Sequence, residues 1–259
     1  MATFLFSEII FGPIRSRRLG ISLGINLLPD NNKWCNFDCI YCECGWNDQN
    51  PAQTKHLPSR GAVRKALEKK LLEMTQRGEI PDVITFAGNG EPTMHHEFAA
   101  IVDDTLALRD KYVPSAKVSV LSNGSMIDRR SVIEALKRVD NNILKFDSAI
   151  METVRAVNQP VKEIDPDAFA EQMKVFGGKQ IIQTMFLRGS WKGSAYDNTQ
   201  PRELEAWEAW IVKVRPASVM IYSLDRDTPA DGLQKISAAE LEEIAIRIRR
   251  HGIPVSVAS

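Results

Sequence analysis

Strand and helix patterns alternate along this 259-residue chain, and this alternation constrains the fold more than any other feature. Short apolar runs, such as residues 82–87 and 117–121, are each followed by a longer stretch with helical spacing of apolar side chains. About six such units are predicted, the first strand over residues 20–28 and the sixth over residues 218–222. Parallel strands need crossover connections, usually helices, so the pattern predicts a parallel sheet with both faces covered.

Six units predict an α/β fold of the partial (β/α)6 TIM-like barrel type, short of the eight units of a full barrel. A doubly wound open sheet is the alternative that periodicity leaves open. We expect one domain over residues 1–259, since 44% hydrophobic residues supply a sizeable core. In either architecture a ligand binds at the carboxyl ends of the strands.

Composition narrows the classes of partner. Lys and Arg number 33 and Asp and Glu also 33, a balance that argues against a polyanion-binding surface over the whole molecule but permits a local basic patch. No apolar run approaches the ~18 residues of a membrane span. The first six residues lack the basic and long apolar regions of a signal peptide. We therefore expect a cytoplasmic protein that does not bind membranes.

All four cysteines lie between Cys35 and Cys44, within an expected loop of about residues 31–58. A disulfide scaffold would spread its cysteines, so this grouping indicates a metal or redox site. Cys35, Cys39 and Cys42 have C-x3-C-x2-C spacing. Iron–sulfur clusters usually take four thiolates, so three would leave one iron open. A zinc site with Cys44 as fourth ligand, or unconnected thiols, is the alternative.

This spacing, with Tyr41 directly before the last cysteine, resembles the signature of the radical S-adenosylmethionine (SAM) superfamily. The resemblance implies that the three cysteines bind a [4Fe–4S] cluster whose open iron takes SAM, and that Tyr41 lies near the adenine. It further implies that an electron splits SAM into methionine and a 5′-deoxyadenosyl radical, which abstracts a hydrogen from a substrate. A low-potential electron donor, flavodoxin or ferredoxin-like, is the expected partner.

Segments after the later strands strengthen this resemblance. Residues 85–93 resemble the family's Gly-Gly-Glu-Pro segment, with Asn89 in place of the first glycine. Glycines let the backbone approach a small zwitterion, and an acidic side chain accepts from its ammonium. Residues 122–124 resemble a Ser/Thr-Asn-Gly segment near the cluster, and Asp147 suits two ribose hydroxyls. Ordinary turns and a helix cap are the alternatives. The expected SAM contacts are Tyr41, Gly88, Asn89, Gly90, Glu91, Ser122, Asn123, Asp147 and Gln183.

Four further segments, residues 11–20, 157–160, 183–186 and 222–229, resemble Fe–S oxidoreductases grouped with wyosine synthases, which build a tricyclic base on tRNA. Wyosine synthases proper carry a second cluster on additional cysteines and a lysine that captures pyruvate. No cysteine of this chain lies outside Cys35–Cys44, which counts against wyosine synthesis itself. We expect Cys44 to be inert.

Arg15, Arg17 and Arg18 form a tight basic cluster that we expect near the barrel mouth. A guanidinium binds phosphate or carboxylate well, so RNA or a small anionic molecule is a candidate substrate. Salt bridges within the protein are the equally weighted alternative.

Three functions remain open. The chain is expected to be a radical SAM enzyme acting on an unidentified substrate. The second reading is a radical SAM activating enzyme or maturase acting on a protein or peptide. The third is a zinc-binding interaction module, which metal analysis distinguishes directly.

Overall fold

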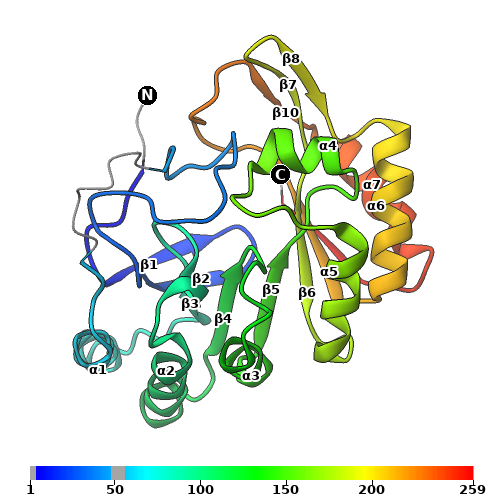
Figure 1. Ribbon diagram of the computed structural model, residues 1–259. Helices are drawn as coiled ribbons and strands as arrows, with labels where there is room; N and C mark the ends of the chain where they lie inside the picture. Colours follow the sequence, from blue (N-terminus) through cyan, green and yellow to red (C-terminus); the bar gives the residue numbers. More distant parts are fainter. Residues whose placement is uncertain (1–3, 48–55, 259) are drawn as a thin grey trace. The chain divides into compact units, whose positions relative to one another are not determined.

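The computed structural model describes residues 4–47 and 56–258 (Figure 1). The chain forms two compact units. We call Leu5–Cys35 with Asn47–Asn142 the N-terminal unit. Met1–Phe4, Asn36–Trp46 and Ile143–Ser259 form the C-terminal unit. The cysteine motif is therefore described in two parts, because Cys35 belongs to the first unit and the other cysteines to the second.

The N-terminal unit is built on strands in the order β1-β2-β3-β4. β1 runs antiparallel to β2, whereas β2, β3 and β4 are parallel. Leu23, Ile84 and Phe86 are buried, and the Phe86 ring contacts the Phe98 ring of α2 edge to face. The elements are β1 (Ile10–Ser16), β2 (Gly20–Ile25), α1 (Arg60–Gln76), β3 (Val83–Phe86), η1 (Pro92–Met94), α2 (Phe98–Tyr112), β4 (Lys117–Ser122) and α3 (Arg130–Arg138).

The C-terminal unit contains parallel strands in the order β5-β6-β9-β11 and an antiparallel sheet in the order β10-β7-β8. β5 (Asn141–Lys145) begins two residues before the unit boundary. The other elements are α4 (Met151–Thr153), η2 (Val154–Asn158), α5 (Pro166–Met173), η3 (Lys174–Phe176), β6 (Ile181–Met185), β7 (Leu187–Trp191), β8 (Ser194–Asp197), α6 (Pro201–Val214), β9 (Ser218–Tyr222), β10 (Leu233–Lys235), α7 (Ala238–Arg249) and β11 (Val255–Ala258).

Alternate side chains of this parallel sheet face the helices. Phe146 stacks on Trp210 of α6 with ring centroids 3.5 Å apart. Trp207 of the same helix donates its indole N–H to Thr184 of β6 at 3.0 Å. Side chains one position away, including Lys145 and Gln183, therefore lie on the face turned away from the helices.

The strand and helix alternation predicted from the sequence is confirmed, since each of six parallel strands is followed by helix before the last strand, β11. Within residues 31–58, the described residues 31–47 and 56–58 belong to no helix and no named strand, and residues 48–55 lie outside the described part of the chain. Within residues 4–47 and 56–258, no helix is long and apolar enough to cross a membrane.

Candidate functional site

In the N-terminal unit, the start of the cysteine loop is paired with the segment after β3. The Trp34 amide donates to the Asn89 carbonyl at 2.7 Å, and the Glu91 amide donates to the Trp34 carbonyl at 3.1 Å. Gly90 has φ 143°, and a Cβ there would lie 1.9 Å from the Trp34 carbonyl oxygen. A residue with a side chain does not fit at this position. Glycine therefore allows the segment after β3 to lie against Trp34, next to Cys35.

Glu91 is fully enclosed, with a 2% exposed surface. Its Oε1 accepts from the Thr93 amide at 3.0 Å and from the Ser122 hydroxyl at 2.9 Å, and its Oε2 accepts from the Asn123 amide at 2.6 Å. Burial raises the pKa of this carboxyl, and the hydrogen bonds from Asn123 and Thr93 oppose that rise. The structure thus joins the two predicted segments, 88–91 and 122–123, through one carboxylate.

Asn123 connects that carboxylate to the first motif cysteine. Its side-chain amide donates to Cys35 Sγ at 3.6 Å, while its Oδ1 accepts from the Ser125 amide at 2.9 Å. The Cys35 amide in turn donates to Asn47 Oδ1 at 3.1 Å. Because an amide N–H near a sulfur favours thiolate, this arrangement suits a metal-ligating cysteine.

Asn89 and Gly88 hold the segment after β3 in position. The side-chain amide of Asn89 donates to the Phe6 carbonyl at 2.9 Å and to the Pro29 carbonyl at 2.7 Å. Its Oδ1 accepts from the backbone amide of Phe6 at 2.9 Å. A Cβ at Gly88 would lie 2.5 Å from Asn26 Oδ1. Asn89 is fully buried, so its side chain anchors the segment that carries Gly90 and Glu91.

In the C-terminal unit, the rest of the cysteine loop is fixed by backbone hydrogen bonds. The Asp38 amide donates to the Asn158 carbonyl at 3.0 Å, and the Ile40 amide donates to the Val157 carbonyl at 2.9 Å. The Cys42 amide closes a turn onto the Cys39 carbonyl at 3.0 Å. The loop is therefore positioned by η2, and Cys39 is held in a buried place.

Asp147, after β5, is the centre of a buried polar group. Its Oδ2 accepts from Asn158 Nδ2 at 2.8 Å, from the Tyr41 hydroxyl and from Lys145 Nζ. Its Oδ1 accepts from the Met185 amide at 3.0 Å. Asn158 Nδ2 also lies 3.7 Å from Cys39 Sγ. The structure thus brings the predicted residues Tyr41 and Asp147 together beside the second cysteine.

Lys145 and Asn158 are the members of this group that the sequence analysis did not assign. Lys145 Nζ also lies 4.6 Å from the centre of the Tyr41 ring. Burial lowers the pKa of Lys145, but the negative charges of Asp147, Cys39 and Tyr222 more than offset this, so the pKa is raised. Lys145 lies two residues before Asp147, and side chains at this spacing on a strand share one face. This spacing could have predicted that Lys145 lies beside Asp147.

Gln183 lies next to Lys145, its register partner across β5 and β6. Its side-chain amide donates to the Tyr222 hydroxyl of β9 at 2.8 Å. Gln183 thus lies on the same face as Lys145 and Asp147, as expected for residues at the carboxyl ends of neighbouring strands.

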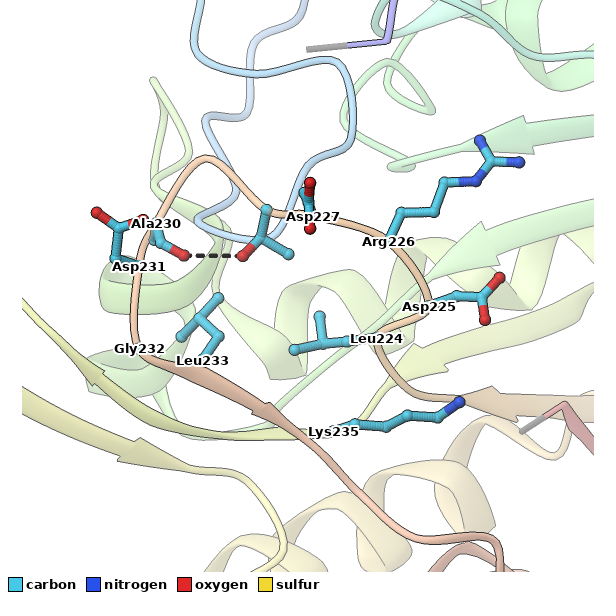
Figure 2. A pocket seen from close by; sticks show the side chains of 10 residues that line it. Leu224, Asp225, Arg226, Asp227, Ala230, Asp231, Gly232, Leu233 and Lys235 are labelled. Atoms are coloured by element: carbon cyan, nitrogen blue, oxygen red, sulfur yellow. Dashed lines mark hydrogen bonds between the residues drawn. The ribbon is translucent and has the colours of Figure 1, made fainter. Parts of the chain in front are cut away.

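A separate pocket lies in the segment between β9 and the end of β10 (Figure 2). Its volume is about 480 Å³, and none of the predicted site residues lines it. Three aspartates, Asp225, Asp227 and Asp231, line it with Arg226 and Lys235. Arg226 forms an ion pair with Glu43 of the cysteine loop at 3.0 Å.

The arginine cluster was expected near the mouth, and this placement is wrong. Arg15 lies at the end of β1, and Arg17 and Arg18 lie in the turn before β2, where Ser16 pairs with Gly20. The Ile21 amide donates to Asp82, just before β3, whereas Glu91 follows that strand. The arginines therefore lie at the amino ends of β2 and β3, at the opposite end of these strands from Glu91. The prediction was wrong because it did not include β1, which runs antiparallel to β2.

The donor set fits an iron–sulfur cluster. Cys35, Cys39, Cys42 and Cys44 are thiols that form no disulfide with one another. Soft thiolates are the ligands that iron–sulfur clusters take, and side-chain amides lie near two of the sulfurs. In the described residues, no group of three or more His, Cys, Asp and Glu side chains is arranged to bind a single metal ion.

Comparison with known proteins is consistent with this fold and site. The family model for the radical SAM superfamily matches residues 32–152, which include the cysteine motif, Glu91, Asn123 and Asp147. In a superposition on a radical SAM methyltransferase from Sphaerobacter thermophilus the TM-score is 0.64 at 14% identity, covering 91% of this chain and 65% of that one. Archaeal TYW1 gives a TM-score of 0.52 at 9% identity, covering 89% and 72%.

Two curated relatives are similar over long stretches. A UPF0026 protein of Methanocaldococcus jannaschii is 33% identical over 183 residues, covering 69% of this chain and 54% of that protein. A protein named GTPase Obg from Brachyspira hyodysenteriae is 28% identical over 238 residues, covering 90% of this chain and 32% of that protein. This chain therefore spans about a third to about half the length of these relatives.

The fold is the partial TIM-like barrel of radical SAM enzymes, which confirms the architecture predicted from the sequence. Residues 32–152 match the radical SAM superfamily model. The narrower grouping with wyosine synthases is not established by these comparisons.

Proposed function

We propose that the chain binds a [4Fe–4S] cluster through Cys35, Cys39 and Cys42 and reductively cleaves SAM to a 5′-deoxyadenosyl radical that abstracts hydrogen from a substrate. The observation that carries this proposal is the radical SAM family match, which spans all three cysteines and the polar residues at the ends of β3, β4 and β5. When bound, the cluster supplies the electron for SAM cleavage and an iron open to a ligand from outside the protein.

The chain's own residues have definite tasks in this proposal. The amides of Asn123 and Asn158, near Cys35 and Cys39, stabilise negative charge on sulfur. Gly90 lets the segment after β3 lie against Trp34, and Glu91 links that segment to Ser122 and Asn123, so both residues would shape the end of the site that takes the methionine part of SAM. The Asp147 carboxylate and the Tyr41 ring are the groups suited to the ribose hydroxyls and the adenine.

Two finer assignments extend this proposal. Reductive cleavage needs one electron for each SAM, so we include a low-potential donor such as a flavodoxin or a ferredoxin-like protein. The grouping with wyosine synthases rests on the four sequence segments given above, and it leaves the substrate unidentified.

The test is anaerobic reconstitution of the full chain with iron and sulfide, followed by SAM and a chemical reductant. Cys39→Ala should lose iron, visible absorbance and 5′-deoxyadenosine production, because three thiolates are the minimum for a cluster with one open iron. Cys44→Ser is the matched control, a change to a neighbouring thiol that should keep all three signals. A protein that binds zinc alone, or a Cys39→Ala variant with undiminished 5′-deoxyadenosine, would overturn the assignment.

A further inference from the structure

We propose that Lys145 anchors an anionic group of the substrate, a carboxylate or a phosphate, with Gln183 as its partner. This inference rests on the proposed function, because it places the substrate beside the residues assigned to the cofactors. It names a substrate class and a specificity-determining residue that the family match does not supply.

The Lys145 ammonium lies near the carboxyl end of the parallel sheet. Lys145 is the last residue of β5, on the face turned away from α6, and its side chain keeps 16% of its surface exposed. The Asp147 side chain beside it keeps only 2%. A lysine at the carboxyl end of a parallel strand, on the open face, lies where ligands bind in α/β folds.

Lys145 and Gln183 each have an N–H group to offer a ligand. A lysine ammonium has three N–H bonds. Asp147 Oδ2 and the Tyr41 hydroxyl take two of those of Lys145, which leaves one for a ligand. The Gln183 amide gives one N–H to Tyr222 and keeps a second. Register partners on adjacent strands lie about 4.8 Å apart, so these two donors can reach two oxygens of one anion.

The negative charge of Asp147 is shared among several hydrogen-bond donors. That carboxylate is shared among the Met185 amide, Asn158, Tyr41 and Lys145. Neutral donors therefore stabilise much of its negative charge, and the ammonium keeps part of its attraction for a second anion. The raised pKa of Lys145 keeps this ammonium charged throughout the physiological range.

Two other cations of the C-terminal unit, Arg226 and Lys235, are less suited. In the pocket of Figure 2, three aspartates face one arginine and one lysine, so an incoming anion is repelled. Arg226 of that pocket is already paired with Glu43. Lys235 lies in the same pocket and is exposed, which makes it a matched lysine for a control.

The experiment measures binding of two probes, inorganic phosphate and malonate, to the full chain by calorimetry, before and after reconstitution with cluster and SAM. The wild-type protein should bind at least one probe with a dissociation constant in the millimolar range. Lys145→Met should weaken that binding by about tenfold or more, the effect of losing a hydrogen bond to a charged group. Lys145→Arg should restore it to within about threefold, and Lys235→Met should leave it unchanged. The probe that binds more tightly identifies the anion as phosphate or carboxylate.

Folding is checked separately. Because Lys145→Met leaves Asp147 without its cation, Gln183→Ala is a second variant that keeps that pair and should weaken anion binding by about threefold to tenfold. The inference is overturned if the wild type binds neither probe, or if a folded Lys145→Met variant binds the probes as the wild type does. It is also overturned if Lys235→Met, and not Lys145→Met, loses probe binding. It is also overturned if Lys145→Met weakens SAM binding as much as anion binding. Absence of SAM cleavage in a protein with Lys145-dependent anion binding would instead count against the proposed function.

Discussion

At the scale of residues, two buried carboxyls of this protein have different surroundings. Asp147 has a lysine ammonium within contact distance, whereas the partners of Glu91 are all neutral donors. Burial without a cation favours the neutral form of an acid, so the pKa of Glu91 is raised. The contribution of Glu91 to the free energy of unfolding therefore changes with pH.

Glu91→Gln tests this difference. Above its ordinary value of 4.5, an unfolded Glu91 has lost its proton while the folded carboxyl still keeps it. The unfolded state then binds fewer protons, so the contribution of Glu91 to the free energy of unfolding falls as pH rises through this window. We expect the free energy of unfolding of the wild type in urea, relative to that of Glu91→Gln, to fall as the pH rises above 4.5. A difference between the two proteins that does not change with pH would contradict the raised pKa.

Prediction from sequence was uneven at this scale. Glu91, Ser122 and Asn123 were placed together correctly, because side chains after neighbouring parallel strands meet at one edge. The buried anchoring place of Asn89 could not be predicted, since its partners Phe6 and Pro29 lie at least 60 residues away in sequence. Lys145 was not assigned because a lysine at a strand end is more often a solvated side chain.

At the scale of elements, the close approach of the cysteine loop to the end of β3 depends on one glycine. Gly90→Ala would place a methyl group 1.9 Å from the Trp34 carbonyl oxygen, in a backbone conformation with φ 143°. We expect a loss of about 2 kcal/mol or more in the free energy of unfolding. Gly61→Ala, in α1 with nothing within 4 Å, is the control and should be neutral or stabilising by up to about 1 kcal/mol. Urea unfolding of both variants decides the point, and equal stabilities would refute the contact.

The elements that could be predicted are those with a clear hydrophobic pattern. The strand predicted over residues 82–87 is β3, and the strand predicted over residues 117–121 is β4. β7, β8 and β10 were missed because they are short, partly exposed and lack an apolar run. β1 was missed because Pro13 and an arginine interrupt its pattern. The antiparallel strands therefore depend on tertiary pairing more than on their own sequence.

At the scale of the whole molecule, basic side chains lie at the amino ends of some parallel strands and at the carboxyl end of β5, where Lys145 is the last residue. Arg15 and Arg17 are exposed and lie at the amino ends of β2 and β3. β3 alone separates this end from Glu91 by about 13 Å for its four residues. Over such a distance in salt, exposed charges are largely screened, so these arginines exert little force on a ligand near Glu91.

The double variant Arg15→Ala with Arg17→Ala follows from this placement. We expect it to leave 5′-deoxyadenosine production within about twofold and the free energy of unfolding within about 0.5 kcal/mol per exposed site. Phosphate and malonate binding should likewise be unchanged, in contrast to Lys145→Met. The measurements are those used above, repeated at low and at physiological salt, because a long-range contribution would appear only at low salt. Loss of anion binding in the double variant at both salt concentrations would show that these arginines bind the anion, and it would contradict the proposal for Lys145.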